Sequence, residues 1–154
     1  PVAGSTQITI AAQSGTLNVA GPAFAVYSGG GTSVATATQT KLSYDTKVFD
    51  TANCYNTSTS RFTPNVAGYY TFIFATAINS TNCNIGLALY KNGAQYKWPV
   101  YPYNSSGNVC GGTAAAYANG STDYFEIYTY FSTGQAVYLS SSTTFFQGFL
   151  LRAA

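Results

Sequence analysis

From residue 40 onward, hydrophobic and polar residues alternate with a period of two, and Tyr, Phe, Val, Ile and Thr dominate the alternating segments. No segment keeps apolar residues at i, i+3, i+4 and i+7 over a helical length. The pattern therefore predicts an all-β protein. Strand-like segments separated by Gly, Asn and Ser at intervals of roughly ten residues are typical of a sandwich or a barrel, and spacing alone does not distinguish these two.

Two features give the clearest local predictions. Residues 69–78 form one long strand, with Tyr70, Phe72 and Phe74 on one face. Residues 85–90 and 95–100 flank the dipeptide Asn92-Gly93, whose tolerance of positive φ suits a type I′ turn and predicts a hairpin. Further strands are expected at residues 124–131, 136–140 and 145–151.

The N-terminal part differs from the rest. Residues 1–21 are small and polar and are interpreted as a tether or a first edge strand, which leaves residues 22–154 as a single head domain. The Gly-rich residues 28–39 are expected to form one long, flexible loop. The first residue is not Met and no leader follows it, so we interpret the sequence as part of a longer protein.

The composition argues against an enzyme. The chain has six basic and four acidic residues and no histidine, so neither a Ser-His-Asp nor a Cys-His nucleophile can be built. The four acids are Asp45, Asp50, Asp123 and Glu126, and neither close pair falls on one face of an unbroken strand. We therefore assign them structural roles, as turn residues and surface charges, and we expect no cofactor.

Metal, membrane and nucleic-acid sites are also not expected. Cys54, Cys83 and Cys110 are interpreted as buried free thiols, with a single disulfide as the alternative, and without histidine they make a poor zinc site. The basic residues are scattered, which disfavours nucleic acid. The longest apolar runs, such as residues 114–118, are far too short to cross a membrane.

Two separated segments resemble a known family. Residues 55–63 with 66–72, and residues 146–151, resemble the central signature and the closing strand of complement component 1q globular heads. The resemblance covers about residues 22–152 and implies a ten-stranded jelly roll of the tumour-necrosis-factor type, assembled as a homotrimer. The protomer core that it implies includes Tyr70, Phe72, Phe146 and Phe149. Some members of the family bind calcium, but four scattered acids make a poor calcium cage here.

A second likeness concerns the source. Residues 118–127 and 89–93 look like the versions of this domain at the ends of bacteriophage fibres and in other phage structural proteins. Such modules are similarly poor in charge and rich in Ser, Thr, Asn and Tyr.

Aromatic residues supply the candidate binding sites. We expect ligand contacts at Tyr96, Trp98, Tyr101 and Tyr103, because aromatic rings suit sugar rings or a protein receptor. The alternative is that these rings pack within or between protomers. Tyr128 and Tyr130 face away from the expected core and are assigned to the trimer interface, with surface binding as the alternative.

These expectations combine into one leading hypothesis. It is a non-enzymatic trimeric head on the virion surface, at the end of a phage fibre shaft, that binds a host cell-surface glycan or protein by avidity. A purely structural trimerising, capping or capsid-decorating module is the second hypothesis. A secreted pattern-recognition domain of the complement type is the third.

Overall fold

The computed structural model describes residues 21–77, 83–105, 109–133, 135–136 and 142–154, and only the backbone of residues 100–105 and 135–136. The described residues form thirteen strands and no helix. The longer strands are β1 (Ala23–Tyr27), β4 (Thr46–Asp50), β7 (Ala67–Ala77), β8 (Cys83–Lys91), β9 (Ala94–Ser105), β10 (Val109–Asn119), β11 (Phe125–Phe131) and β13 (Phe145–Ala153). The two-residue strands are β2 (Ser33–Val34), β3 (Thr40–Lys41), β5 (Tyr55–Asn56), β6 (Arg61–Phe62) and β12 (Gln135–Ala136).

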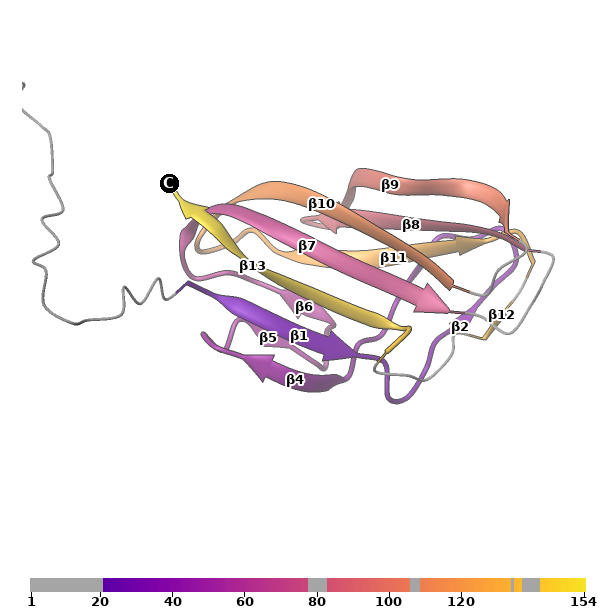
Figure 1. The fold of residues 1–154 in the computed structure, drawn as a ribbon, viewed down its shortest axis with the longest axis horizontal. Coiled ribbons are helices and arrows are strands. Elements are labelled where there is room, and N and C mark those ends of the chain that lie inside the picture. Colours follow the sequence, from indigo (N-terminus) through magenta and orange to yellow (C-terminus); the bar gives the residue numbers. More distant parts are fainter. Residues whose placement is uncertain (1–20, 78–82, 106–108, 134, 137–141) are drawn as a thin grey trace, which may run out of the picture.

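Most of the strands form two sheets that pack face to face (Figure 1). The first sheet has the order β10-β7-β13-β1-β4, and the second has the order β5-β6-β11-β8-β9 with β3 paired to β11. A third, two-stranded sheet pairs β2 with β12. The all-β class predicted from the sequence is confirmed, and so is the sandwich that the resemblance implies. The strand number exceeds the implied ten because five strands are only two residues long.

The clearest sequence predictions hold in detail. The strand expected at residues 69–78 is β7, and Tyr70, Phe72 and Phe74 all point into the core. The predicted hairpin joins β8 to β9 through Asn92 and Gly93, whose φ angles are 55° and 78°. Two other expectations, the tether in residues 1–20 and most of the strand at 136–140, lie outside the described residues.

Three strands of the first sheet, β1, β4 and β10, are not among those that the pattern predicts. β10 consists largely of Ala and Gly, which have low strand propensity, yet it pairs along its whole length with β7. Its inward residues Ala116 and Ala118 are buried beside the large rings of β7, where small side chains fit. β1 is only five residues long and lies between β13 and β4, so its pairing partners are distant in the sequence.

Aromatic rings fill the space between the sheets. Phe24 of β1 stacks on Phe62 of β6 with ring centroids 4.2 Å apart, and its edge meets Phe146 of β13 at 4.8 Å. Tyr70, Phe72 and Phe146 are fully buried, as the sequence resemblance implies. Phe149 is not: it is 44% exposed, because it lies three residues from Phe146 and alternation along β13 turns it to the opposite face.

Gly148 allows β13 to pack between β1 and β7. A Cβ atom at this position would lie 2.8 Å from Cδ1 of Phe72 and 3.0 Å from Cε1 of Phe24. Core packing at this density leaves no room for an added methyl group. The glycine in the closing-strand motif is therefore required by the two rings that face it and by the Thr71 carbonyl oxygen, which would lie 2.8 Å from an added Cβ atom.

Three aspartates hold the loops. The Asp45 carboxylate accepts hydrogen bonds from the backbone N–H groups of Gly29 and Gly30, both at 2.7 Å, and so ties down the loop expected to be flexible. Asp50 accepts from the N–H groups of Cys54 and Tyr55, both at 2.9 Å.

Asp123 links the β8–β9 turn to the β10–β11 connection. Its carboxylate accepts hydrogen bonds from Asn92 Nδ2 at 2.7 Å and from the N–H of Asn119 at 3.0 Å, and it pairs with Lys91 Nζ at 2.9 Å. Burial raises the pKa of all three aspartates, but these hydrogen bonds outweigh it, so each carboxyl has a pKa below its ordinary value.

Replacement of Gly148 by alanine should destabilise the protein by about 2 kcal/mol, because the methyl group must displace Phe72 or Phe24. Gly111→Ala is the matched control in a neighbouring part of the same sheet, since its Cβ would meet its closest neighbours at an ordinary 3.4 and 3.6 Å. Urea unfolding of both variants tests this prediction. Equal stability of the two variants would contradict it.

Acid should destabilise the protein through the three aspartates. Their pKa values are lower in the folded chain than in the unfolded chain, so their stabilisation is complete above about pH 4 and is lost as the pH falls through the folded values. The urea midpoint measured at stepped pH should decline over that acid range. Asp123→Asn should make the decline shallower, and an unchanged profile in this variant would show that Asp123 does not contribute.

Candidate functional site

Trp98 lies at an open edge of the sandwich, where β9 and β10 are the edge strands of the two sheets. It lines a hollow of about 250 Å³ together with Lys97, Pro99, Thr113, Ala114 and Ala115. Tyr96 is 42% exposed on the same strand and is not part of this lining. The side chains of Tyr101 and Tyr103 lie outside the described residues, so the site predicted from these four aromatics is described only at Tyr96 and Trp98.

Tyr128 and Tyr130 lie on the outward face of the second sheet, and both are half-buried. The Tyr128 ring stacks on Tyr90 of β8, with ring centroids 3.9 Å apart and an interplanar angle of 21°. The hydroxyl of Tyr90 in turn donates a hydrogen bond to Gln39. Part of the apolar area of these tyrosines is therefore covered within the protomer.

Glu126 is buried on this same outward face, although the sequence suggested a surface charge. Its carboxylate accepts hydrogen bonds from Arg61 Nε at 2.8 Å and Lys41 Nζ at 3.1 Å, and its side chain is only 1% exposed. The Arg61 guanidinium also lies 4.2 Å from the centre of the Tyr124 ring. Two cations thus cover the carboxylate and tie β3 and β6 to β11, and the Tyr124 ring lies against one of these cations.

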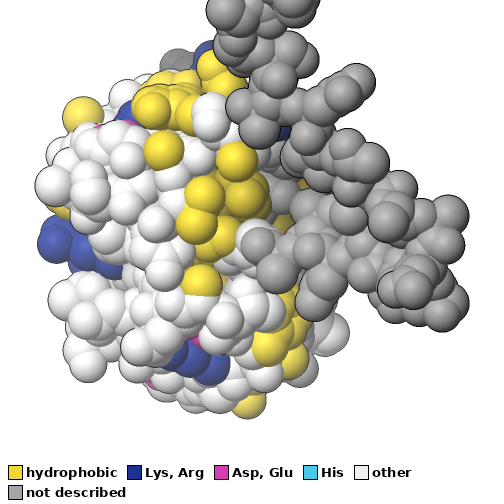
Figure 2. Space-filling model, turned by 90° about the vertical axis from the view of Figure 1, so that its left-hand side faces the viewer, with side chains coloured by type: hydrophobic (Ala, Val, Ile, Leu, Met, Phe, Trp, Pro, Cys, Tyr) yellow, Lys and Arg dark blue, Asp and Glu magenta, His cyan; other side chains and the backbone are white. Residues whose placement is uncertain are grey.

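The outward face of the first sheet has a different character. Its central part consists of the residues of β1, β7, β10 and β13 that point away from the core, and none of these is charged up to the irregularity at Leu150 and Arg152. The charges of this sheet lie at its margins, where Arg152 is paired with Tyr69 and the edge strand β4 carries Lys47 and Asp50. Tyr69, Tyr117 and Phe149 are 50%, 41% and 44% exposed on this face. Between them lie small or neutral side chains: Ala23, Ala25, Thr71, Ile73, Gly111, Thr113, Ala115 and Gln147. Figure 2 shows hydrophobic patches on one end of the molecule, with the basic side chains well separated.

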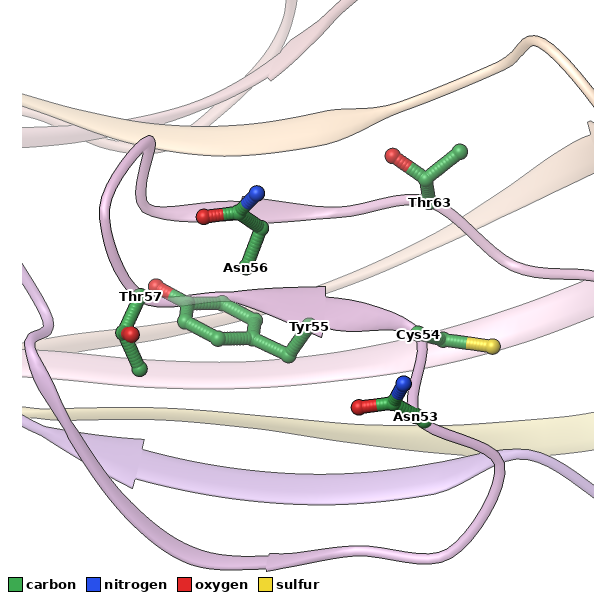
Figure 3. A pocket seen from close by; sticks show the side chains of 6 residues that line it. All are labelled: Asn53, Cys54, Tyr55, Asn56, Thr57 and Thr63. Atoms are coloured by element: carbon green, nitrogen blue, oxygen red, sulfur yellow. The ribbon is translucent and has the colours of Figure 1, made fainter.

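A second hollow, of about 450 Å³, lies at β5. It is lined by Asn53, Cys54, Tyr55, Asn56, Thr57 and Thr63, which come from the loop before β5, from β5 itself, from the turn after it and from the segment after β6 (Figure 3). No lining residue carries a charge. We call this hollow the polar hollow.

Hydrogen bonds hold the walls of the polar hollow. Asn56 Oδ1 accepts from the N–H groups of Ser58 and Thr59 at 2.9 and 3.2 Å, which fixes its carboxamide. The N–H of Thr63 donates to the carbonyl of Cys54 at 2.8 Å. Sequence reasoning missed this hollow, because the only local signals were an Asn-x-Ser motif at Asn56 and a Thr-rich loop, and both are common in this chain.

The described residues offer no arrangement for acid–base or nucleophilic catalysis. Each of the four acids is bound to backbone N–H groups or to cations. The three cysteines are free and buried, and burial raises the pKa of Cys110 to about 12, so its thiol stays protonated at neutral pH. Within the described ranges, no three His, Cys, Asp or Glu residues come together as metal ligands. The same ranges contain no helix long and apolar enough to cross a membrane.

Solved structures share this architecture at low sequence identity. Murine APRIL at pH 5.0 is 13% identical with a TM-score of 0.67, and the match covers 86% of this chain and 100% of that chain. The globular domain of zebrafish complement 1qA is 19% identical with a TM-score of 0.56, covering 88% and 100%. PRD1 vertex protein P5 is 14% identical with a TM-score of 0.57, covering 85% and 97%.

No curated protein matches the chain. The family model of the C1q domain, however, matches residues 23–151, a span that runs from the start of β1 almost to the end of β13. This match agrees with the sandwich topology and with the glycine in the closing strand. The chain therefore belongs to the C1q domain family and has its tumour-necrosis-factor-like jelly-roll fold.

Proposed function

We propose that this chain is a non-enzymatic, homotrimeric head domain on a virion surface, carried by a fibre or a similar appendage, that recognises an uncharged glycan on a host cell. The observation that carries the proposal is the uncharged central part of the outward face of the first sheet, formed by β1, β7, β10 and β13 before Leu150. Contiguous apolar surface of this kind is rare on monomers and marks an interaction site. A threefold arrangement of copies would bury it without any unpaired charge.

The second sheet supports this assignment by contrast. Its outward face carries Arg61, Lys41 and Glu126, three of the ten charged residues of the chain. Charged groups are depleted from the centres of protein interfaces. The second sheet therefore suits contact with solvent, and we assign the trimer interface to the first sheet rather than to Tyr128 and Tyr130.

The virion assignment rests on two observations of different kinds. The chain shares its fold with PRD1 vertex protein P5, and its sequence resembles the domain versions carried by phage structural proteins. Recognition of a neutral ligand follows from the scarcity of charge, since only 6% of residues are Asp, Glu, Lys or Arg. Three weak sites on one rigid body would bind a repetitive surface by avidity.

The trimer interface can be tested with one charge on each sheet. Thr71→Arg places a cation between Ala115 and Phe149, its neighbours across the first sheet, and should convert the trimer to a folded monomer. Tyr130→Arg places the same charge on the second sheet and should leave the trimer intact. Light scattering gives the mass, and circular dichroism checks the fold. The reverse result would assign the interface to Tyr130, and a monomeric parent protein would overturn the trimer.

Trp98 should act at the subunit contact. Its hollow shares Thr113 and Ala115 with the outward face of the first sheet, so a neighbouring protomer on that face would reach the rim of the hollow. We expect Trp98→Ala to weaken the trimer at least about tenfold, as loss of a buried aromatic anchor does. Sedimentation at decreasing concentration measures this. An intact trimer that loses binding to an array of uncharged glycans would instead make Trp98 a ligand contact.

Recognition itself is tested with the intact trimer on glycan arrays and on host cells. Binding to an uncharged glycan supports the proposal. A trimer that binds neither glycans nor cells would leave only the structural role of trimerising or capping.

A further inference from the structure

We propose that the polar hollow at β5 is a saccharide site whose side chains bind the hydroxyl groups of an uncharged sugar. The inference rests on the proposed recognition function and adds to it the residues and the chemistry of contact. It places the ligand away from the first sheet, because no residue that lines the polar hollow belongs to the outward face of that sheet.

The hollow presents open hydrogen-bonding groups. Among the described residues, four groups in its walls have no hydrogen-bond partner: Nδ2 of Asn53, Nδ2 of Asn56, Oγ1 of Thr57 and Oγ1 of Thr63. Carboxamide and hydroxyl groups match the alternating donors and acceptors of a sugar ring. Two amide donors and two hydroxyls, which both donate and accept, can therefore engage several hydroxyls of one ring.

The local electrostatics disfavour a charged ligand. The charges beside the hollow are Lys47 and Asp50, which form an ion pair at 3.0 Å, and Arg61, the cross-strand neighbour of Asn56, which pairs with Glu126 at 2.8 Å. Lys47 Nζ also reaches Asn53 Oδ1 at 3.5 Å, so it is already shared between two oxygens. Each of these charges already has a partner within the protein, whereas a neutral polyol needs no charged partner.

A peptide strand is also disfavoured. β5 is the edge strand of the second sheet, and an edge can accept an extended peptide through its free N–H groups. Here the N–H groups of Cys54 and Tyr55 are both donated to the Asp50 carboxylate. These two N–H groups are therefore not free to pair with an added strand. A ligand at this edge would be bound by side chains instead.

The binding groups are preorganised. The turn that Asn56 forms with Ser58 and Thr59 holds its Nδ2 in place, and Asn53 lies at a φ of 51°, a conformation that asparagine tolerates better than most residues. Little conformational entropy is then lost when a ligand binds.

The hollow has no exposed aromatic ring on which a sugar could stack, so we expect a low affinity at each site. Tyr55 is only 3% exposed and its ring stacks on Phe24 inside the core, with centroids 5.3 Å apart. A sugar would be held by hydrogen bonds with little stacking, so each site should be weak. Strong attachment then requires three sites at once, which is what a trimer supplies.

The experiment uses the intact trimer and an array of uncharged oligosaccharides built from glucose, galactose, mannose, rhamnose and N-acetylhexosamines. Asn56→Asp keeps an oxygen that accepts from Ser58 and Thr59, removes the Nδ2 donor and adds a negative charge, for which the control below corrects. Thr63→Val keeps the shape and removes the hydroxyl. Asn65→Asp is the control, since this exposed residue lies close in sequence, takes the same charge and does not line the hollow.

We expect Asn56→Asp and Thr63→Val each to weaken binding of the parent's glycan about tenfold or more, while Asn65→Asp leaves it unchanged. Light scattering and circular dichroism confirm that every variant is a folded trimer. Undiminished binding by Asn56→Asp and Thr63→Val would overturn the polar hollow as the site and leave the recognition function standing. No binding of any uncharged saccharide by the parent trimer would overturn both.

Discussion

The close approach of β13 to the aromatic core is the constraint on which the rest of this structure depends. Phe24 and Phe72 occupy the space that a side chain at position 148 would need, and Phe146 fills the position two residues before it. β13 is the strand between β1 and β7, so the spacing of the whole first sheet depends on this contact. Aromatic rings pack densely and prefer particular stacked or edge-to-face geometries. These preferences favour one relative position of the two sheets.

This core also decides what the surface can do. Since one face of each strand is used for packing, the alternate residues are forced outward, and their character differs between the sheets. The first sheet presents tyrosine, phenylalanine and small neutral residues. The second presents a carboxylate covered by two cations and a stacked tyrosine pair. A single fold thus has one face suited to another copy of the chain and one suited to water, which is the basis of the proposed trimer.

The few charges serve the loops more than the surface. Asp45, Asp50 and Asp123 bind backbone N–H groups in three separate connections, where no regular strand pairing would satisfy those donors. With the acids committed in this way, the open polar groups that line the polar hollow are amides and hydroxyls. Because the few charged residues are used elsewhere, the polar hollow is neutral. A neutral hollow suits the uncharged ligand that we propose for it.

Sequence reasoning predicted the all-β class, the β8–β9 hairpin, the inward face of β7 and the family, because these depend on local alternation, on turn conformations and on short motifs. Packing between distant strands was needed to turn Phe149 outward, to make the Ala- and Gly-rich β10 a strand and to bury Glu126. Only the tertiary structure assembled the polar hollow from residues 53–57 and Thr63. These outcomes depend on which strand, distant in the sequence, pairs with the one in question, and on which cations contact Glu126. Periodicity along one strand carries no information about its neighbours.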